Sequence, residues 1–400
     1  MIVRPPEKAK NAESIQTDSS PKKLRILFVS HTYVVGVNQG KLEAIAHTNQ
    51  ADVGLLVPDS WKALSWNQIF SLERVCDRVE YYPANVLFNG KTGGYFYGLG
   101  SLIKALRHYA PDILQVEEEV FSLSTFQMAI AARVTDTPLV VFGWENMDHP
   151  LSKVRQWTRK FVLDTAKLIV AGNQDGANLL RRWGYAGNIA IMPQMGVDPD
   201  IFAGEVRSHP KDRPFQIGFM GRLVHEKGID ILFSAAQTLK EKGHRFEIVL
   251  CGSGSDEALL KKDALRKGIA DCVVWKGKVS HADVPAEMVS FDSLVLPSRT
   301  VSTWKEQFGH VLIEAMSMGI PVVGSNSGEI PNVIDNPAQI FPENDAAALS
   351  AVLDKIMSDR AAYKTASQKG LERVSKHYTH KRIAEKLVSE WTKVADESKR

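Results

Sequence analysis

The sequence has few of the features that mark disulfide-bonded, membrane-spanning or highly charged proteins. Its 400 residues include three cysteines, Cys76, Cys251 and Cys272, which are scattered and lack metal-ligand spacing. No apolar run approaches the roughly 18 residues of a membrane span, and the polar start of the chain lacks the core of a signal peptide. The net charge of +3 favours neither a nucleic-acid binder nor a polyacidic substrate. We expect buried thiols, a cytoplasmic protein and a flexible tail over residues 1–23.

Several catalytic signatures are missing as well. There is no Ser-His-Asp order, no HExxH and no P-loop, so hydrolase and ATPase functions have no support. The segment HTYVVGVNQGK, which follows the first strand-like run, does not fit GxGxxG, and no clear acidic residue is placed to bind a ribose. An NAD-dependent oxidoreductase is therefore a weak alternative, kept because tandem α/β units also occur in that class.

What the sequence does contain is an alternation of short β-branched runs with helix-like stretches. Runs that are apolar almost throughout are typical of strands buried on both faces of a parallel sheet, and the stretches between them suit crossover helices. The runs of the first half are 25–30, 53–58, 112–117, 138–142, 168–172 and 188–192, and those of the second half are 215–221, 246–252, 272–277, 293–298 and 321–325.

The two halves open in the same way. LRILFVS leads into a loop with Gly36 and then a helix-like segment, as FQIGFMG leads into RLVHEKG and another helix-like segment. We therefore predict an α/β fold of two Rossmann-like, doubly wound domains, 24–200 and 201–375, that face a central cleft. Residues 199–214 are expected to link them with little reason to pack, because they include three prolines and six charged residues. By analogy, we expect residues 376–400 to form a helix that packs back across the domains.

The segment WKEQFGHVLIEAMSMGIPVVGSN contains a predicted helix, 309–318, that begins just after Glu306. On this helix His310, Glu314 and Ser317 fall on one narrow polar stripe. Such a stripe commonly faces water. Here the preceding strand places the start of the helix at the carboxyl edge of a sheet, which favours a stripe that faces a ligand, with carboxylates that accept sugar hydroxyls.

The segment FMGRLVHEKGIDIL carries two cations, Arg222 and Lys227, between a strand and a helix. Two cations at this place are suited to clamp a diphosphate leaving group, and loss of one such group costs about 10²–10³ in rate. The alternative is a solvated basic turn in which Lys227 pairs with Glu226.

Three further motifs give weaker signals. Gly252 and Gly254 follow a strand and lie where a phosphate is expected, although a plain tight turn explains them equally well. Residues 198–200, Asp-Pro-Asp, have the form of a metal site, but their place beside the linker favours a structural role and no bound metal. The acidic run 117–119 closes a strand at the cleft edge, where it faces either an acceptor or, as we expect, water.

One helix-like stretch combines basic and aromatic residues, which suits contact with anionic lipid. An ordinary exposed helix face is the favoured alternative. The residues are Lys153, Arg155, Trp157, Arg159, Lys160 and Phe161.

Taken together, the ordered motifs resemble the family-4 retaining glycosyltransferases, which have the two-domain GT-B fold. The resemblance covers most of residues 24–390 and is strongest from 196 to 345. It rests on GRLVHEKG (221–228), VLCGSGSD (249–256), PS (297–298), the pair Glu306 and Glu314 spaced by seven residues, and GVDPDIF (196–202).

The resemblance implies transfer from a UDP- or GDP-sugar, with retention of anomeric configuration and no cofactor, to a glycan or lipid-linked acceptor in polysaccharide or glycolipid synthesis. Peripheral contact with the inner face of a membrane is a further expectation, and the small net charge predicts no nucleic-acid partner. Arg222, Lys227 and Glu306 would act on the donor diphosphate and sugar. The other donor-binding positions are Gly36, Gly252, Gly254, Phe308, Gly309, His310, Val311 and Glu314.

The chain departs from the family pattern at three places. Trp144-Glu145-Asn146 stand where many relatives have a histidine, so Glu145 and Asn146 become candidates for contact with the sugar or acceptor. The usual two glycines of a late loop read Ser327-Gly328-Glu329, and the loop RTVSTWK before Glu306 is long. Two alternatives from other classes stay open: a nucleotide-sugar epimerase of the same fold, and a non-catalytic sugar-nucleotide binder, which the retained charged set argues against.

Overall fold

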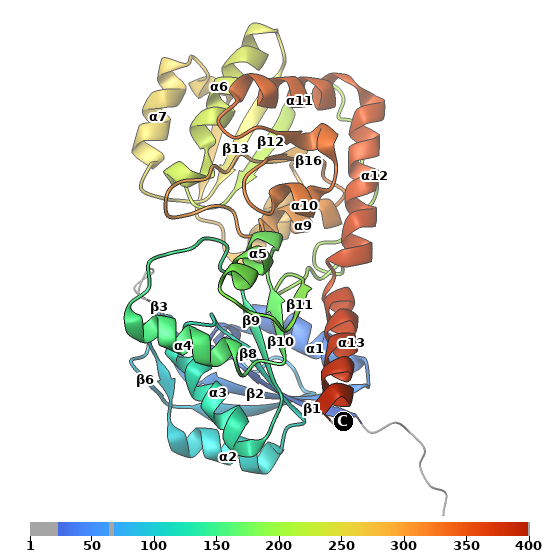
Figure 1. Ribbon diagram of the computed structural model, residues 1–400. Coiled ribbons are helices and arrows are strands. Elements are labelled where there is room, and N and C mark those ends of the chain that lie inside the picture. The colour runs from blue at the N-terminus through green and yellow to red at the C-terminus, as the bar shows by residue number, and fades with distance from the viewer. Residues whose placement is uncertain (1–22, 64–67, 399–400) are drawn as a thin grey trace, which may run out of the picture.

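The computed structural model describes residues 23–63 and 68–398, so the tail predicted over residues 1–23 lies outside it apart from Lys23. Two parallel α/β sheets lie one above the other, each with helices on both faces (Figure 1). In the described residues the first sheet has the order β11-β10-β9-β8-β1-β2-β5 and the second β14-β13-β12-β15-β16-β17. The predicted fold class, two parallel-sheet α/β domains, is thus confirmed.

The first domain is built on seven parallel strands. These are β1 (Leu24–Val29), β2 (Ala51–Pro58), β5 (Val79–Ala84), β8 (Ile113–Glu117), β9 (Leu139–Gly143), β10 (Leu168–Ala171) and β11 (Asn188–Ile191), with the hairpins β3 (Ser60–Ala63) to β4 (Gln68–Ser71) and β6 (Val86–Leu87) to β7 (Phe96–Tyr97). Its helices are α1 (Gly40–His47), α2 (Leu99–Tyr109), α3 (Leu123–Thr135), α4 (Lys153–Leu163) and α5 (Gln174–Arg182), with the short turns η1 (Thr32–Val34) and η2 (Gly36–Gln39).

The second domain follows the same plan. Its strands are β12 (Phe215–Met220), β13 (Phe246–Cys251), β14 (Val273–Gly277), β15 (Ser293–Leu296), β16 (Val322–Ser325) and β17 (Ile340–Phe341). Its helices are α6 (Ile229–Glu241), α7 (Glu257–Arg266), α8 (Val284–Met288), α9 (His310–Ser317), α10 (Ile330–Ile334), α11 (Ala346–Ser358) and α12 (Arg360–His377), with the short turns η4 (His225–Lys227), η5 (Ala270–Cys272), η6 (His281–Asp283) and η7 (Pro337–Gln339). The last helix of the chain is α13 (His380–Ser398).

Each apolar run predicted as a strand is a strand, with ends shifted by no more than two residues. Most of their side chains are buried, as expected where helices cover both faces of a sheet, and the main exceptions are the edge strands β11 and β14. The sequence pattern missed β5, whose side chains alternate between buried and exposed at the sheet edge, and the two-residue strand β17. No helix in the described part of the chain combines the length and apolar character needed to cross a bilayer.

The segment 199–214 was expected to have little reason to pack, and this prediction is wrong. The guanidinium of Arg207 donates to the backbone carbonyl of Met318 at 3.1 Å, and that of Arg213 grips the carboxylate of Asp292 at 2.6 and 2.7 Å. Its charged side chains satisfy backbone and carboxylate groups of the second domain, so a charged composition here does not mean a solvated linker.

The chain passes from one domain to the other twice, and backbone hydrogen bonds join the two crossing segments. The amide of Val197 donates to the carbonyl of Tyr378 at 2.8 Å, and the amide of His380 donates to the carbonyl of Val197 at 3.2 Å. Helix α12 packs on the second domain beside α9, whereas α13 packs on the first beside α1, where the indole of Trp391 donates to Gln115 at 2.9 Å (Figure 1). The carboxyl ends of both sheets therefore face one another across the cleft.

Candidate functional site

The best-defined polar contact in the cleft joins Lys227 to Glu306. Lys227 ends the short turn η4 after β12, and Glu306 lies in the loop that follows the neighbouring strand β15. The Lys227 ammonium is 2.6 Å from Oε2 of Glu306, and the hydroxyl of Ser298 donates to the same oxygen at 2.8 Å. Among the described residues Oε1 receives no hydrogen bond, and the Lys227 ammonium also lies 4.7 Å from the centre of the Trp304 ring. The pair is largely buried, with one carboxylate oxygen left for another donor.

Arg222 begins the same loop but is far more exposed. Its guanidinium pairs with Glu226 at 3.2 Å, and its side chain is 59% exposed. The alternative in which Lys227 pairs with Glu226 is therefore wrong, because Glu226 pairs with Arg222 instead. An exposed pair of this kind is weak, so a bound anion competes for the guanidinium at little cost.

Glycines hold this loop against its neighbours. A Cβ on Gly252 would lie 1.8 Å from the carbonyl oxygen of Gly221, and one on Gly254 would lie 2.1 Å from that of Leu223. A Cβ on Gly228, where φ is +68°, would lie 1.9 Å from the carbonyl of Pro297. These glycines allow the backbone approach that places the Arg222–Lys227 loop. The predicted donor contacts of Gly252 and Gly254 stay predictions.

The polar stripe of α9 is hydrogen-bonded along its length, although the side chain of His310 is still 40% exposed. His310 Nε2 lies 3.2 Å from the carbonyl of Gly196, His310 Nδ1 lies 3.1 Å from Glu314, and the Ser317 hydroxyl donates to the carbonyl of Phe202 at 2.8 Å. Burial alone would lower the pKa of His310, but the hydrogen bond to Glu314 and its charge raise it overall. The stripe therefore binds the chain segment that crosses between the domains.

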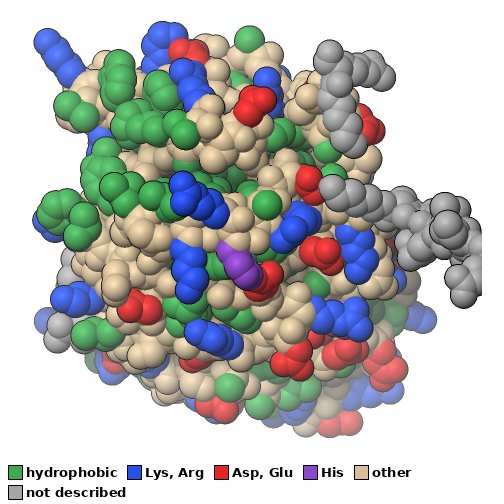
Figure 2. Space-filling view, turned by 90° about the horizontal axis from the view of Figure 1, so that it is seen from below, with side chains coloured by type: hydrophobic (Ala, Val, Ile, Leu, Met, Phe, Trp, Pro, Cys, Tyr) green, Lys and Arg blue, Asp and Glu red, His purple; other side chains and the backbone are tan. Residues whose placement is uncertain are grey.

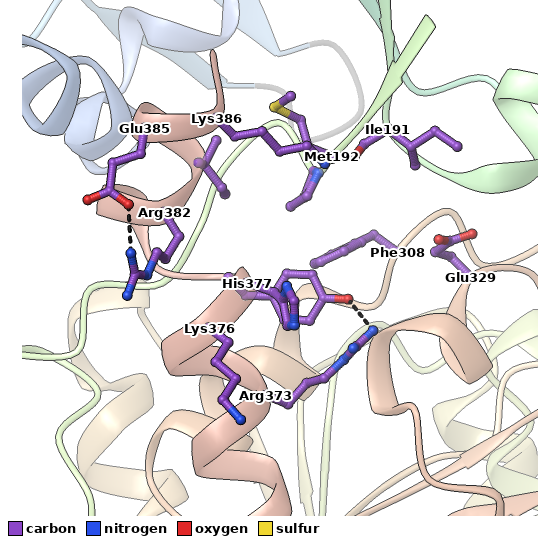
Figure 3. Close-up of a pocket in the computed structure, with 14 residues that line it drawn as sticks. Ile191, Met192, Phe308, Glu329, Arg373, Lys376, His377, Arg382, Glu385 and Lys386 are labelled. Atoms are coloured by element: carbon purple, nitrogen blue, oxygen red, sulfur yellow. Dashed lines mark hydrogen bonds and ion pairs between the residues drawn. The ribbon is translucent and has the colours of Figure 1, made fainter. Parts of the chain in front are cut away.

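The start of α9 is set by Gly309, whose φ is +81° and which precedes the helix proper. Phe308 packs edge-on against Tyr378 at a centroid distance of 5.6 Å. Phe308 and Glu329 also line a pocket of about 500 Å³ on the side of the cleft where α12 meets α13 (Figure 3). Four of its fourteen lining residues are Lys or Arg and two are Glu, and neither Lys227 nor Glu306 lines it. The predicted donor roles of Phe308, Gly309, His310 and Val311 concern their backbone and remain untested.

The three places where the sequence departs from the pattern of the family it resembles meet at the domain interface. The side-chain amide of Asn146 donates to the carbonyl of Glu306 at 3.2 Å. The carboxylate of Glu329 accepts from the amide of Gln174 at the start of α5, at 3.0 Å, and burial raises the pKa of Glu329. Lys305 pairs with Asp175 at 2.6 Å. In the sequence these are three separate differences from the family pattern. In the structure they belong to one zone of contact between the two domains.

Glu145 and Gly36 are less directly placed. The carboxylate of Glu145 accepts from the amides of Asn146 and Met147, at 3.0 and 3.1 Å, so it shapes its own loop. The amide of Gly36 donates to Glu73 at 2.6 Å. Contact of either residue with a sugar stays a prediction.

The acidic run 117–119 was expected to be solvated, and this expectation is wrong. Glu117 and Glu118 are 0% and 1% exposed. Glu117 pairs with the buried Lys41 at 2.5 Å, and burial lowers the pKa of that lysine against the opposing charge of Glu117. Glu119 accepts from two backbone amides of the next loop, at 2.8 and 3.0 Å. The expectation was wrong because residues 117–119 lie at the end of a strand that a loop covers, and not in a solvated loop.

A histidine that the sequence analysis did not single out belongs to this cluster. His31 follows β1, and its Nδ1 is hydrogen-bonded to Glu118, which also accepts from the hydroxyl of Tyr95 at 2.7 Å. Its ring centre lies 4.4 Å from that of Trp61. Strands β1 and β8 are neighbours in the first sheet. After β1 the chain continues toward one edge of the sheet, and after β8 it continues toward the other edge. Such a switch point is where α/β sheets bind ligands. The sequence signal was available, since His31 directly follows the first apolar run.

The Asp-Pro-Asp segment has a local structural use. The carboxylate of Asp198 accepts from the amide of Asp200 at 2.9 Å, which closes a turn at the domain crossing. Within residues 23–63 and 68–398, no group of three or more His, Cys, Asp or Glu side chains is arranged to hold a metal ion.

Comparisons with known proteins support a class for this chain. Residues 204–373 match the family model described as Glycosyl transferases group 1. The amylovoran biosynthesis glycosyltransferase AmsK of Erwinia amylovora is 32% identical over 171 residues, which span 42% of this chain and 42% of that protein. These matches, which lie within less than half of the chain, support a group 1 glycosyltransferase.

Two solved structures extend the likeness to nearly the whole chain at the level of fold. Sucrose-phosphate synthase from Thermosynechococcus elongatus is 20% identical with a TM-score of 0.69, over 93% of this chain and 99% of that one. HepE from Anabaena, in complex with UDP, is 17% identical with a TM-score of 0.67, over 92% and 100%. The fold of this chain is therefore the GT-B fold.

Proposed function

We propose that this protein is a retaining, metal-independent glycosyltransferase that moves a hexose from a UDP- or GDP-sugar to a glycan or lipid-linked acceptor in polysaccharide or glycolipid synthesis. The observation that carries the proposal is the 2.6 Å contact between Lys227 and Glu306 at the ends of adjacent parallel strands. That position in a doubly wound sheet is where nucleotides bind. The epimerase and oxidoreductase alternatives are not favoured by the comparisons.

The charges divide into two roles. Lys227 and Arg222 neutralise the negative charge that grows on the diphosphate as the bond between the anomeric carbon and the phosphate oxygen breaks. Glu306 accepts hydrogen bonds from sugar hydroxyls through Oε1, because Oε2 is occupied by Lys227 and Ser298. The acceptor hydroxyl attacks the same face from which the phosphate leaves, and its proton passes to the departing phosphate oxygen. Glu314 is assigned to the nucleotide ribose.

Relatives supply the support for the substrate class. HepE was solved with UDP, and a Mycobacterium tuberculosis relative, 30% identical over 164 residues, is named as a GDP-mannose-dependent mannosyltransferase. Both donors present a diphosphate to the protein, so the cationic loop suits either. The nucleotide base, which distinguishes UDP from GDP, would contact other residues than this loop. UDP and GDP are therefore the two donors to be tested.

The test compares release of nucleoside diphosphate from UDP-glucose and GDP-mannose by the parent, Glu306→Gln and Lys227→Ala. We expect each variant to stay folded and to lose roughly 10²–10³ in rate, because each removes a group that acts on the transition state. Loss of the buried pair should lower the melting temperature more in Lys227→Ala, which leaves Glu306 without its partner, than in Glu306→Gln. Lys364→Ala, on the exposed side of α12, is the matched control and should keep the parent rate.

Two results would overturn the proposal. Release at the parent rate by both variants would show that the site lies elsewhere. Conversion of a UDP-hexose to its epimer without release of UDP, or stabilisation by NAD(H) and by no nucleoside diphosphate, would point to the corresponding alternative class.

A further inference from the structure

The pocket of about 500 Å³ beside the junction of α12 and α13 is built by both domains. Met192 and Pro193, which follow the last strand of the first domain, line one side of it, and Phe308 of the second domain lines another. The end of α12 and the first turns of α13 complete its wall (Figure 3). None of the charged residues assigned to the donor lines this pocket, so the proposed transfer reaction leaves it without a role.

Four basic side chains from α12 and α13 line this pocket. Lys376 and His377 end α12. Arg382 and Lys386 lie about one turn apart in the first turns of α13. Exposed cations alone do not mark a site, since lysines, arginines and acidic side chains are scattered over the end of the molecule formed by the first domain (Figure 2). What distinguishes these four residues is that they line one cavity.

The two lysines meet little opposing charge. The Lys376 ammonium lies 3.9 Å from the carboxylate of Glu372, and at least half of each side chain is exposed, so this pair is weak. The Lys386 ammonium donates to the carbonyl of Ile191 at 2.6 Å, and within residues 23–63 and 68–398 no carboxylate forms an ion pair with it. Both ammonium groups can therefore bind an anion without first giving up a strong partner.

The pKa of His377 responds to the charges around it. Burial lowers this pKa below its ordinary value of 6.5, and the positive charges of Arg373, Lys386 and Lys376 lower it further. The carboxylate of Asp335 works in the opposite direction without reversing the shift. The electrostatic potential at this end of the pocket is thus positive, which favours an anion.

The two acidic residues of the pocket do not cancel this potential. The carboxylate of Glu385 is already paired with the guanidinium of Arg382 at 2.8 Å. The carboxylate of Glu329 accepts from the amide of Gln174 at 3.0 Å, and Figure 3 shows it at the opposite end of the pocket from Lys376 and Arg382. The pocket therefore has a cationic end on the side of α12 and α13.

Apolar side chains form much of the remaining wall. Ile191, Met192, Phe308 and Ile383 all line the pocket, and the ring of Phe308 is held in place by its edge-on contact with Tyr378. A bare inorganic anion would reach the cations but leave these side chains in contact with water. A ligand with both an anionic group and a ring uses the whole cavity.

We propose that this pocket binds a small organic phosphate monoester, with the phosphate on the side of Lys376 and Lys386 and the ring against Phe308. A phosphate monoester carries close to two negative charges at pH 7 and offers several acceptor oxygens, which suits two ammonium groups. A carboxylate carries a single charge and matches the two lysines less well. The proposal does not depend on the transfer reaction, because it concerns residues outside the donor site.

Calorimetric titration of the full chain tests the proposal with three probes: phenyl phosphate, benzoate, which has the same ring and one charge, and inorganic phosphate, which has no ring. We expect phenyl phosphate to bind at least roughly tenfold more tightly than either of the others. The double variant Lys376→Gln, Lys386→Gln should bind phenyl phosphate at least roughly tenfold more weakly than the parent. Lys227→Ala should bind it like the parent, which separates this pocket from the donor site.

The matched control replaces two other exposed lysines of α12, Lys364→Gln and Lys369→Gln, and should also bind like the parent. Melting temperatures check that every variant is folded. The proposal is overturned if phenyl phosphate does not bind, if the Lys376 and Lys386 double variant binds it like the parent, or if benzoate binds equally well. Loss of binding in Lys227→Ala would instead place the phosphate in the donor site, and equal loss in the α12 control would show a general effect of charge.

Discussion

Three consecutive glutamates, 117 to 119, lie at the end of strand β8 and just after it, yet they have different environments. Glu117 is paired with a buried lysine, Glu118 with a histidine and a tyrosine, and Glu119 with two backbone amides. Burial raises the pKa of Glu119 to about 8, although the amides of Trp144 and Glu145 work in the opposite direction. Residue type alone therefore says little about the charge that each carboxyl carries.

A pH dependence of stability follows from Glu119. Its pKa is about 8 in the folded chain against an ordinary value of 4.5, so the folded state holds the proton more tightly. Stability is then greatest at low pH in this window and falls as pH rises from about 4.5 to about 8. Glu119→Gln stays neutral and keeps the amide contacts, so the parent should lose at least about 1 kcal/mol more than the variant between about pH 5.5 and about pH 8.5. Denaturant unfolding at both pH values measures this, and parallel curves would contradict it.

Individual residues of the site were predictable where a sequence motif directly follows a strand whose place in the sheet is known. Lys227 and Glu306 follow adjacent parallel strands, so their meeting follows from sheet order. The partners of Glu117 and Glu118 were not predictable, because Lys41 and His31 lie far away in sequence and their burial depends on how the loop after β1 folds over the sheet.

At the scale of elements, the site depends on loops that pass close to one another. The Arg222–Lys227 loop fits only because its neighbours present glycines, as at Gly252, where φ is +150° and a Cβ would lie 1.8 Å from a carbonyl oxygen. The apolar runs predicted the strands that carry these loops. They did not predict β5, whose half-exposed pattern is weak, or the hairpins, which lack long apolar runs.

Gly252→Ala should displace the loop that carries Arg222 and Lys227. We expect a loss of about 1–3 kcal/mol in stability and a nucleoside diphosphate affinity at least roughly tenfold weaker. Gly268→Ala is the control, since Gly268 also has positive φ (+64°) but nothing lies within 4 Å of its Cβ position. It should lose about 1 kcal/mol of stability and keep its affinity. Equal affinities of both variants for the diphosphate would contradict the role assigned to the close approach.

At the scale of the molecule, the two domains touch through the sequence departures. Asn146, Asp175 and Gln174 of the first domain meet Glu306, Lys305 and Glu329 of the second. Two parallel-sheet domains were predictable from the repeated strand pattern. The contacts between the domains were not predictable, because they join loops, and loops have no periodic sequence pattern.

These contacts should hold the domains together without donor. Lys305→Ala removes the 2.6 Å pair with Asp175, and with Asn146→Ala it removes the contact to Glu306 as well. We expect small-angle scattering of the double variant to give a larger radius of gyration than the parent, with the difference reduced by saturating nucleoside diphosphate. Lys242→Ala, which breaks an exposed pair with Asp354 inside the second domain, is the control. Identical radii for the double variant and the parent would show that other contacts set the domain arrangement.

The central claim is that the Lys227 ammonium binds the donor diphosphate, and calorimetric titration of Lys227→Ala with UDP and GDP tests it most directly. The account predicts that the nucleotide bound by the parent binds this variant roughly ten- to a hundredfold more weakly, as expected for loss of a charged hydrogen bond, while Lys242→Ala binds like the parent. Equal dissociation constants for Lys227→Ala and the parent would contradict it.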